Sequence, residues 1–322
     1  MMPDRDSTQK KLRFVVTGAG GFLGSHVVRE LLTSTGHEVV AVTSQTAHEL
    51  KDVLERAPYP AMHRLPDVLP RRELLTPGSL GADDVIINCA FPWNRGGVEL
   101  ADGLEFLVGL FDVASKAHVH SFVNVSSQSV YSQSRTEPAD EQSTIECDTP
   151  YSTAKYAMEL AAGQVLSHDV LVNARMSSLI GVGYDVRIVN RFLARFLAHQ
   201  DVQIQGGEQL FDFMDVRDAA KALVVLALTD PRNRPTVVNV GSNNALALKE
   251  IAHTVADVVR AETEHRPVIT WSPSSGDTRT LGLNSNLLHR EFGFTPQFTL
   301  ADSTRHILHG MTDTRPAAEQ RP

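Results

Sequence analysis

The feature that most constrains the fold of this 322-residue chain is a glycine-rich turn, TGAGGFLG, at residues 17–24. A strand-like run at residues 12–17 precedes it, and hydrophobic residues at helical spacing follow it. Gly18 permits a tight turn, Gly21 lets a ligand approach the backbone, and Gly24 allows the helix to pack closely on the strand. This strand–turn–helix context predicts a site for the pyrophosphate of a dinucleotide.

The first turn of the predicted helix would complete this site. The backbone N–H groups of Phe22 and Leu23 lie at the helix N-terminus, where unpaired donors and the positive end of the helix dipole favour anions. The three useful glycines are spaced i, i+3 and i+6, which is not the GxGxxG pattern. A glycine-rich turn that holds no ligand is the alternative interpretation.

Strand-like and helical patterns alternate through the first half of the chain. Apolar strand-like runs occupy residues 12–17, 38–43, 84–89, 121–125 and 170–175. Near-continuous apolar strands separated by helices indicate a parallel sheet that is buried on both faces. We therefore predict an α/β protein with a Rossmann-type, doubly wound parallel sheet. Residues 44–82 contain several prolines and suggest one weak strand around 63–65.

The regular alternation of strand-like and helical segments changes after about residue 180, although no low-complexity linker marks the change. We expect residues 1–180 to form the dinucleotide-binding domain. Residues 181–322 are expected to form a smaller C-terminal α/β domain that binds the substrate, with residues 212–241 folding back onto the first domain.

The end of the second predicted strand bears on which cofactor is bound. An acidic residue there would hydrogen-bond the 2′-hydroxyl of the adenosine ribose in NAD and repel the 2′-phosphate of NADP. This chain has Thr43, Ser44 and Gln45 instead, and the hydroxyls of Thr43 and Ser44 can contact a phosphate. The absent acid favours NADP, whereas the absent arginine leaves NAD open.

A tyrosine and a lysine four residues apart, Tyr151 and Lys155, begin another predicted helix. Positions i and i+4 share one face of a helix, so a phenol and an ammonium group lie side by side. A neighbouring cation stabilises a phenolate and lowers the pKa of the tyrosine, which suits it to proton transfer. Ser127 lies at the carboxyl end of a predicted strand, where open α/β sheets bind ligands, and its hydroxyl can donate to the same substrate oxygen. A partly buried tyrosine beside a surface lysine is the alternative.

These motifs resemble the extended short-chain dehydrogenase/reductase family, which contains nucleotide-sugar epimerases, dehydratases and ketoreductases. The resemblance rests on TGAGGFLG, SSQSVY and YSTAK, and continues through FDFMDVRDAA, VVNVGS and FGFTP, from about residue 14 to 299. It implies that Ser127, Tyr151 and Lys155 are catalytic and that Tyr151 and Lys155 also hold the cofactor. It further implies cofactor contacts from the residues after the fourth strand of the family, which here are Cys89, Ala90 and Phe91.

Several positions depart from the family pattern. Dehydratases of the family have an Asp-Glu pair directly after the catalytic hydroxyl residue, but Gln128 and Ser129 stand there, which argues against dehydration. Phe211 replaces an arginine that usually binds the diphosphate of the substrate. A second family arginine corresponds to Arg279, and Ser178 stands where an asparagine is common. We take Ser127, Ser178 and Arg279 as the candidate substrate residues.

Composition excludes several other classes of protein. The formal net charge of −8 argues against a nucleic-acid partner, which requires clustered Lys and Arg. The two cysteines form no disulfide framework, and a reducing compartment fits. We find no apolar run long enough to span a membrane and no signal-peptide pattern, so the cytoplasm is the expected location. Among the 13 histidines, the pairs His118 with His120 and His306 with His309 could suggest a metal site, but no cluster of carboxylates or cysteines accompanies either pair, so no metal is expected.

The favoured function is a 4-ketoreductase that acts on a nucleotide-linked 4-keto-6-deoxyhexose with NADP. A nucleotide-sugar 4-epimerase with tightly bound NAD is the first alternative, because epimerases of the resembled family usually retain their cofactor. A non-catalytic module that senses dinucleotides is an alternative of another class. The resemblance also implies a homodimer formed by two helices of each subunit.

Overall fold

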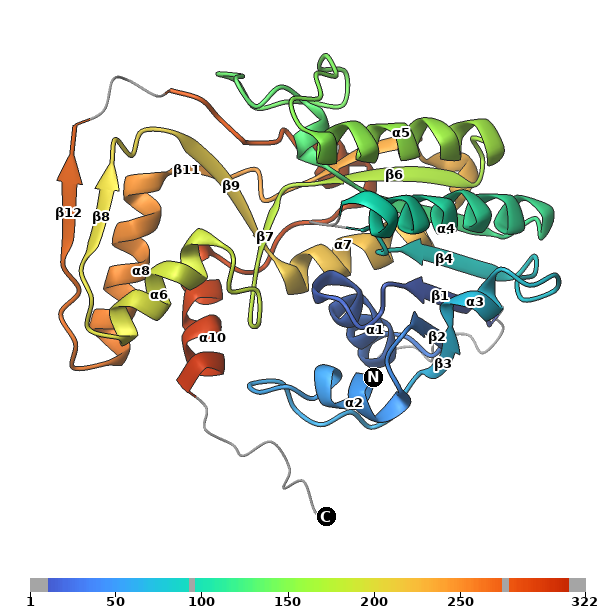
Figure 1. Ribbon diagram of the computed structural model, residues 1–322, viewed down its shortest axis with the longest axis horizontal. Coiled ribbons are helices and arrows are strands. Elements are labelled where there is room, and N and C mark those ends of the chain that lie inside the picture. Colours follow the sequence, from blue (N-terminus) through green and yellow to red (C-terminus); the bar gives the residue numbers. More distant parts are fainter. Residues whose placement is uncertain (1–10, 93–95, 274–277, 313–322) are drawn as a thin grey trace, which may run out of the picture.

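The structure is a computed structural model that describes residues 11–92, 96–273 and 278–312. Its centre is a seven-stranded sheet in the order β3-β2-β1-β4-β5-β6-β10, in which every neighbouring pair is parallel (Figure 1). The strands are β1 Arg13–Thr17, β2 Glu38–Thr43, β3 Asp67–Pro70, β4 Asp84–Asn88, β5 Ser121–Ser127, β6 Leu171–Met176 and β10 Val237–Val240.

Both faces of this sheet are buried, as the apolar strands predict. Successive side chains of a strand point to opposite faces, and β1 shows the consequence. Phe14 and Val16 pack against the helices of one face, whereas Val15 packs against those of the other. The first face carries α1 (Phe22–Ser34) and α7 (Val216–Leu228), and the second carries α4 (Gly97–Lys116) and α5 (Pro150–Val165). The predicted doubly wound sheet is confirmed.

A second lobe follows β6 in the chain and lies at one end of the sheet (Figure 1). It contains a three-stranded sheet, a parallel strand pair and helices around a core of their own. Its elements are β7 Ser178–Ile180, β9 Leu210–Asp215, β11 Ala245–Ala247, β8 Val202–Gln205, β12 Ile269–Ser272, α6 Ile188–Leu197, α8 Leu248–Glu262 and α10 Leu300–Thr312.

Part of the second half of the chain returns to the main sheet. Helix α7 packs beside α1, and β10 pairs with β6. The short helix α9 (Asn286–Phe292) contributes Leu288 to the same core. On this basis we keep the division into residues 1–180 and 181–322, with 212–241 folding back, as a proposal. The part of the chain that the structure describes contains no helix long and apolar enough to cross a membrane.

The segment between β2 and β4 differs from the expectation. The weak strand expected around residues 63–65 is wrong, because the backbone there is irregular and the strand, β3, begins at Asp67. Arg64 instead donates hydrogen bonds to the carbonyls of Leu31, Leu32, Thr35 and His37 at and after the end of α1. Helix α2 (Ala47–Leu54), with a capping box from Thr46 and Glu49, and the single turn α3 (Arg71–Leu74) complete the segment.

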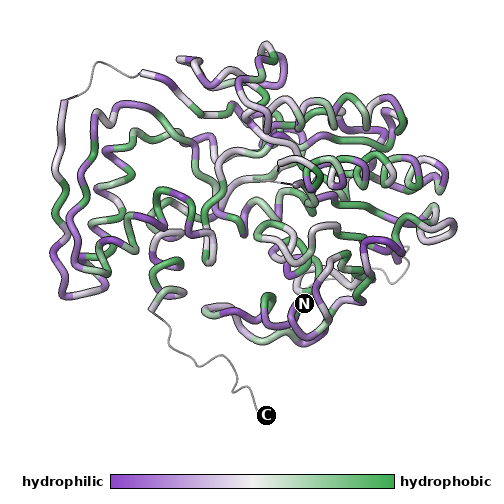
Figure 2. Tube along the Cα trace, viewed as in Figure 1, coloured by the Kyte–Doolittle hydropathy of each residue, from purple (hydrophilic) through white to green (hydrophobic). Residues whose placement is uncertain are grey.

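Hydropathy along the trace follows this architecture. Figure 2 shows hydrophobic residues along the central strands and hydrophilic residues in many of the outer turns. Two short 3-10 helices, Gln128–Val130 and Pro231–Asn233, follow β5 and α7 in the chain. The first is important for the site, because it begins directly after Ser127.

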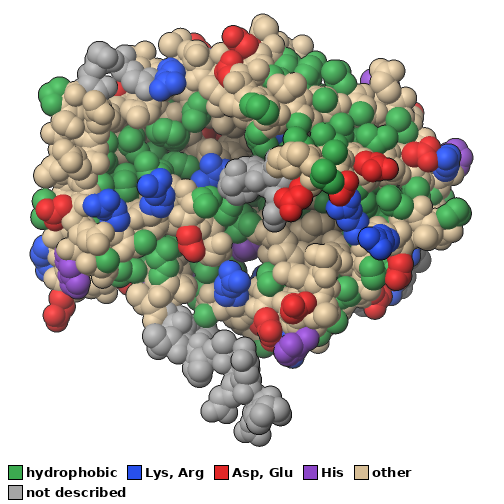
Figure 3. All heavy atoms as spheres, viewed as in Figure 1, with side chains coloured by type: hydrophobic (Ala, Val, Ile, Leu, Met, Phe, Trp, Pro, Cys, Tyr) green, Lys and Arg blue, Asp and Glu red, His purple; other side chains and the backbone are tan. Residues whose placement is uncertain are grey.

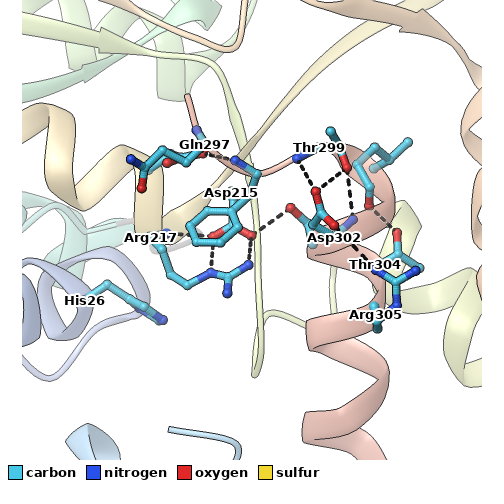
Figure 4. Close-up of polar contacts among 12 residues, drawn as sticks. His26, Asp215, Arg217, Gln297, Thr299, Asp302, Thr304 and Arg305 are labelled. Atoms are coloured by element: carbon cyan, nitrogen blue, oxygen red, sulfur yellow. Dashed lines mark hydrogen bonds and ion pairs between the residues drawn. The ribbon is translucent and has the colours of Figure 1, made fainter. Parts of the chain in front are cut away.

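A polar network attaches the second lobe to the first near the start of α7 (Figure 4). Asp215 caps α7 by accepting from the backbone N–H of Arg217 at 2.8 Å, and it also accepts from the guanidinium of Arg217 at 2.7 and 2.8 Å. The hydroxyl of Ser303, on α10, donates to Asp215 at 2.7 Å. The carboxylate of Asp218 accepts from the backbone N–H of Gln297 at 2.9 Å. These carboxylates therefore hold α10 and its approach loop against α7.

His26 is buried on α1 close to this network. One ring nitrogen lies 2.7 Å from the carbonyl oxygen of Phe22, and the other lies 2.7 Å from the hydroxyl of Tyr59. Burial lowers the pKa of His26 to about 4. The unfolded chain binds this proton near the ordinary pKa of about 6.5, so stability is lost as the pH falls between these two values.

We predict that His26 makes the protein acid-sensitive. Between pH 7.5 and pH 5, this side chain alone should lower the free energy of unfolding by about 2 kcal/mol. The measurement is the melting temperature against pH for the wild type and for His26→Gln, whose melting temperature should fall less steeply with acidification. Parallel curves for the two proteins would show that His26 is not the cause.

Candidate active site

The glycine-rich turn forms a close-fitting backbone cradle. Gly18 has a φ of +65°, and a Cβ there would lie 2.8 Å from the backbone nitrogen of Ala90. A Cβ on Gly24 would lie 2.2 Å from the carbonyl oxygen of Gly18. Gly21 precedes α1 without a side-chain cap, and no acidic residue occupies the first turn. The N-terminus of α1 is therefore suited to an anionic group such as a pyrophosphate.

Gly24→Ala tests this cradle. The clash with the backbone of Gly18 should lower the free energy of unfolding by about 2 kcal/mol or more and shift the turn away from the cofactor. Gly36→Ala is the matched control, because a Cβ on Gly36 meets nothing within 4 Å. Thermal unfolding and dinucleotide titration of both variants should show losses for Gly24→Ala alone. Equal behaviour of the two variants would contradict the account of the turn.

A cavity of about 480 Å³ opens beside the cradle at the carboxyl ends of β1, β2 and β4. It brings together most of the cofactor residues expected from the sequence: Gly18, Gly21, Thr43, Ser44, Cys89, Ala90 and Phe91. Phe22, Leu23 and Gly24 do not line it but form the adjacent first turn of α1. The cavity is also lined by Gln45, which follows Ser44, and by residues that the sequence analysis missed: Arg71, Glu99, Gly103 and Phe106.

The chemistry of the cavity lining also fits a dinucleotide. The side-chain carbonyl oxygen of Gln45 is buried without a hydrogen-bond partner, and a Cβ on Gly20 would collide with it at 2.0 Å. A buried acceptor without a partner is costly and is satisfied by a ligand that donates to it, such as a ribose hydroxyl or an amine.

Buried amides support the floor of the site across four strands. The hydroxyl of Thr17 donates to Asn88 at 2.6 Å, Asn88 donates to Asn124 at 3.0 Å, and Asn124 donates to Asn173 at 2.8 Å. All four residues are less than 6% exposed. The hydrogen bonds fix the relative positions of β1, β4, β5 and β6 below the site. No local sequence signal shows that these side chains meet.

Ser127, Tyr151 and Lys155 come together as the motifs predict. Ser127 is the last residue of β5; its hydroxyl accepts a hydrogen bond from the hydroxyl of Ser129 at 2.9 Å and lies near the phenol of Tyr151. Tyr151 and Lys155 lie one turn apart near the start of α5, which Thr149 caps. The Nζ atom of Lys155 donates to the carbonyl oxygen of Val125 at 2.8 Å.

Phe91 joins this group to the cofactor cavity. Its ring lines the cavity and meets the ring of Tyr151 edge to face, with centroids 5.4 Å apart. The Nζ atom of Lys155 lies 3.9 Å from the centre of the same ring. Residues that follow β4, end β5 and begin α5 therefore lie together in one site.

The pKa of Tyr151 differs from the expectation. Burial raises it above the ordinary value, whereas the hydrogen bond with Ser127 and the charge of Arg187 lower it. The pKa of Lys155 falls to about 7, also because of burial. The expected lowering of the pKa of Tyr151 by Lys155 is not observed, because desolvation outweighs the favourable contacts and weakens the positive charge of the lysine.

The second lobe contributes a stack that the motifs did not predict. Tyr184 stacks on Phe22 with ring centroids 4.3 Å apart, and the guanidinium of Arg187 lies 5.1 Å from the ring of Tyr184. Because Phe22 begins α1, this stack connects the second lobe to the glycine-rich turn. Hydropathy alone could not reveal it, since the partners are far apart in sequence.

The remaining candidate substrate residues lie on the second lobe. Ser178 is half-buried at the start of β7, where it pairs with Phe213, and Arg279 is exposed beside the start of β9. Neither lines the cavity described above. Phe211, at the position of the usual arginine, stacks against Phe213 with centroids 5.8 Å apart. Among the residues that the structure describes, no group of three or more His, Cys, Asp and Glu side chains could hold a metal.

Comparison with known proteins agrees with this geometry. Residues 14–241 match the family described as "NAD dependent epimerase/dehydratase family". A dTDP-glucose 4,6-dehydratase of Streptomyces griseus is 26% identical over 307 residues, covering 89% of this chain and 90% of that protein. A dTDP-4-dehydro-6-deoxy-D-allose reductase of a Streptomyces species is 26% identical over 270 residues, covering 76% and 80%. A UDP-N-acetylglucosamine 4-epimerase from Bacillus cereus shares the fold, with a TM-score of 0.74 at 19% identity over 94% of this chain and 100% of that one.

Proposed function

The chain belongs to the NAD dependent epimerase/dehydratase family, and from this premise we propose that it reduces the 4-keto group of a nucleotide-linked 4-keto-6-deoxyhexose. The expected membership of the extended short-chain dehydrogenase/reductase family, and hence an NAD-dependent enzyme of this type, is confirmed. The reductase proposal depends mainly on the neighbouring hydroxyls of Ser127 and Tyr151 and on the lack of an acidic residue directly after Ser127.

The raised pKa of Tyr151 suits the reductive direction. A phenol that stays protonated at neutral pH can donate its proton to the substrate oxygen as the carbonyl becomes an alcohol. The hydroxyl of Ser127 holds that same oxygen, and Lys155 beside Phe91 would hold the ribose next to the nicotinamide. When bound, the reduced nicotinamide supplies the hydride that adds to the carbonyl carbon. Solvent then returns a proton to Tyr151.

Several relatives are dehydratases, but the residues after Ser127 argue against dehydratase activity in this chain. Gln128 is buried, and its side-chain oxygen accepts from Arg135 at 2.7 Å. Ser129 donates to Ser127. Neither side chain is a carboxylic acid, so neither can serve as the acid–base pair that eliminates water. The dTDP-4-dehydro-6-deoxy-D-allose reductase, which is 26% identical to this chain, is an example of a relative that reduces a keto group.

We further propose that NADP is the preferred cofactor. Thr43 and Ser44 line the cavity where an acidic residue would exclude a 2′-phosphate. If NAD is bound tightly instead, the 4-epimerase alternative gains support, because an epimerase returns the hydride to the same carbon and keeps its cofactor.

Two measurements separate these functions. Denaturing the purified protein and quantifying released dinucleotide should yield little, since a reductase exchanges its cofactor. Mass spectrometry of the nucleotide sugar after incubation with NADPH should show a gain of two hydrogens at the keto group. Stoichiometric release of NAD with an isomeric product would establish the epimerase, and saturable dinucleotide binding without any product would establish a sensing module.

A homodimer is proposed as well. Helices α4 and α5 lie side by side on the outer face of the sheet (Figure 1) and leave Val98, Val108, Leu160 and Val165 exposed. Figure 3 shows hydrophobic side chains gathered over this part of the surface. Two copies of this helix pair could bury these side chains against each other.

A further inference from the structure

The cofactor cavity contains a cation that no motif indicates. We infer that Arg71 is the residue that recognises the 2′-phosphate of NADP(H), and that it does so from the start of α3, directly after β3, and not from the end of β2. This inference rests on the proposed dinucleotide site, since it assigns one residue of that site to one group of the ligand.

Strand register places Arg71 beside the position where ribose specificity is ordinarily determined. Strands β2 and β3 are parallel, and Thr43 pairs with Pro70. The next residues, Ser44 and Arg71, therefore leave the carboxyl ends of neighbouring strands, about 5 Å apart in backbone position. Ser44 occupies the region where an acid or an arginine ordinarily discriminates between the two cofactors. The first residue after the neighbouring strand β3 thus supplies the positive charge that the end of β2 lacks.

Two contacts with α4 hold the guanidinium on the cavity wall. Its Nη2 atom donates to the carbonyl oxygen of Asp102 at 2.6 Å, and its Cζ atom lies 4.3 Å from the centre of the ring of Phe106. These contacts restrict a long side chain that is otherwise exposed. A restrained guanidinium with further N–H groups accessible to solvent is well suited to a phosphate.

The charges around the cavity favour this assignment. Among the lining residues that the structure describes, Arg71 and Glu99 are the charged ones, and Glu99 has an interaction partner of its own. Thr43, Ser44 and Gln45 add hydroxyl and amide groups that can donate to a phosphate without repelling it. A 2′-phosphate would therefore meet one guanidinium and several neutral donors.

If Arg71 instead contacts the adenine ring, its loss would weaken the binding of NADP and NAD equally. The guanidinium and Phe106 could form a wall for the adenine ring, which both dinucleotides share. The experiment therefore compares ligands that differ only at the 2′ position, so that a phosphate contact and an adenine contact give different results.

The variants are Arg71→Gln, which removes the charge, Arg71→Lys, which keeps it, and Arg72→Gln as the matched control. Arg72 is also exposed but does not line the cavity. Titration calorimetry with NADPH and NADH measures binding to each protein directly. Adenosine 2′,5′-bisphosphate and adenosine 5′-phosphate serve as probes without nicotinamide. Thermal melts confirm that each variant is folded.

We expect Arg71→Gln to weaken NADPH and adenosine 2′,5′-bisphosphate by about 10- to 100-fold, the loss typical of a hydrogen bond to a charged group. NADH and adenosine 5′-phosphate should change by less than about threefold, and Arg71→Lys should retain most of the NADPH affinity. Arg72→Gln should resemble the wild type. Equal weakening of NADPH and NADH, or unchanged NADPH affinity, would overturn the inference.

These binding measurements need no sugar substrate. If NADPH binding depends on Arg71 but no nucleotide sugar is reduced, the inference stands and the proposed reaction fails. If a sugar is reduced but Arg71→Gln binds NADPH and NADH with the same affinities as the wild type does, the reaction stands and the inference fails.

Discussion

Tyr151→Phe is expected to lower kcat by at least about 10³-fold, the upper part of the range for losing a general acid. The substitution removes only the hydroxyl that lies near Ser127 and leaves the ring against Phe91. Affinity for the dinucleotide should therefore stay within a few-fold of the wild type. Initial rates and cofactor titration of the same preparation measure both quantities.

Tyr156→Phe is the matched control for this variant. Tyr156 lies on the same helix but packs with Val130 and Tyr131 in a separate small cluster. Its loss of a hydroxyl should leave turnover near the wild-type rate. Unchanged turnover in Tyr151→Phe would contradict the proposed proton transfer, and equal losses in both variants would point to damage to the helix.

Arg175→Met is expected to lower the free energy of unfolding by about 3–5 kcal/mol, because it leaves a buried carboxylate without its ion pair. Arg175 and Glu159 are 4% and 5% exposed. The guanidinium donates to Glu159 at 2.7, 3.1 and 3.2 Å and to the hydroxyl of Tyr131 at 2.9 Å. Ser126 also donates to Glu159, so the pair supports the backbone that leads into Ser127. Differential scanning calorimetry should show a melting temperature lower by roughly 4–7 °C.

The double variant Arg175→Met, Glu159→Leu distinguishes an unpaired charge from lost packing. Removing both partners of a buried pair costs less than removing one, so the double variant should melt at a higher temperature than Arg175→Met alone. A single variant that melts with the wild type, or a double variant less stable than the single one, would contradict the role given to this pair.

The sequence predicts the central strands well, because burial on both faces requires apolar runs that stand out locally. Strand β3 lacks this signal. It is short, none of its residues is fully buried, and prolines lie just before and at the end of it. Its position follows from pairing with β2, which is a long-range property. Arg71 was missed for the same reason, since its place in the cavity depends on that register.

In the candidate site as well, some features could be predicted from the sequence and others could not. Gly18, Tyr151 and Lys155 could be assigned because their roles depend on neighbours within a few residues. The pKa of Tyr151 could not be predicted, because it depends on burial by Phe91 and on groups of the second lobe. The amides below the site meet only when four strands assemble. Local sequence patterns therefore predict which side chains carry the chemistry, whereas the assembled fold determines their burial and their pKa values.

The central claim is a hydride transfer that consumes a reduced nicotinamide, and the most direct test is absorbance at about 340 nm. The purified protein would be mixed with a nucleotide-linked 4-keto-6-deoxyhexose and either NADPH or NADH. We expect loss of NADPH absorbance, one equivalent for each keto sugar consumed, with a slower rate for NADH. No loss with either cofactor, while the sugar is converted to an isomer, would contradict a reductase and identify an epimerase.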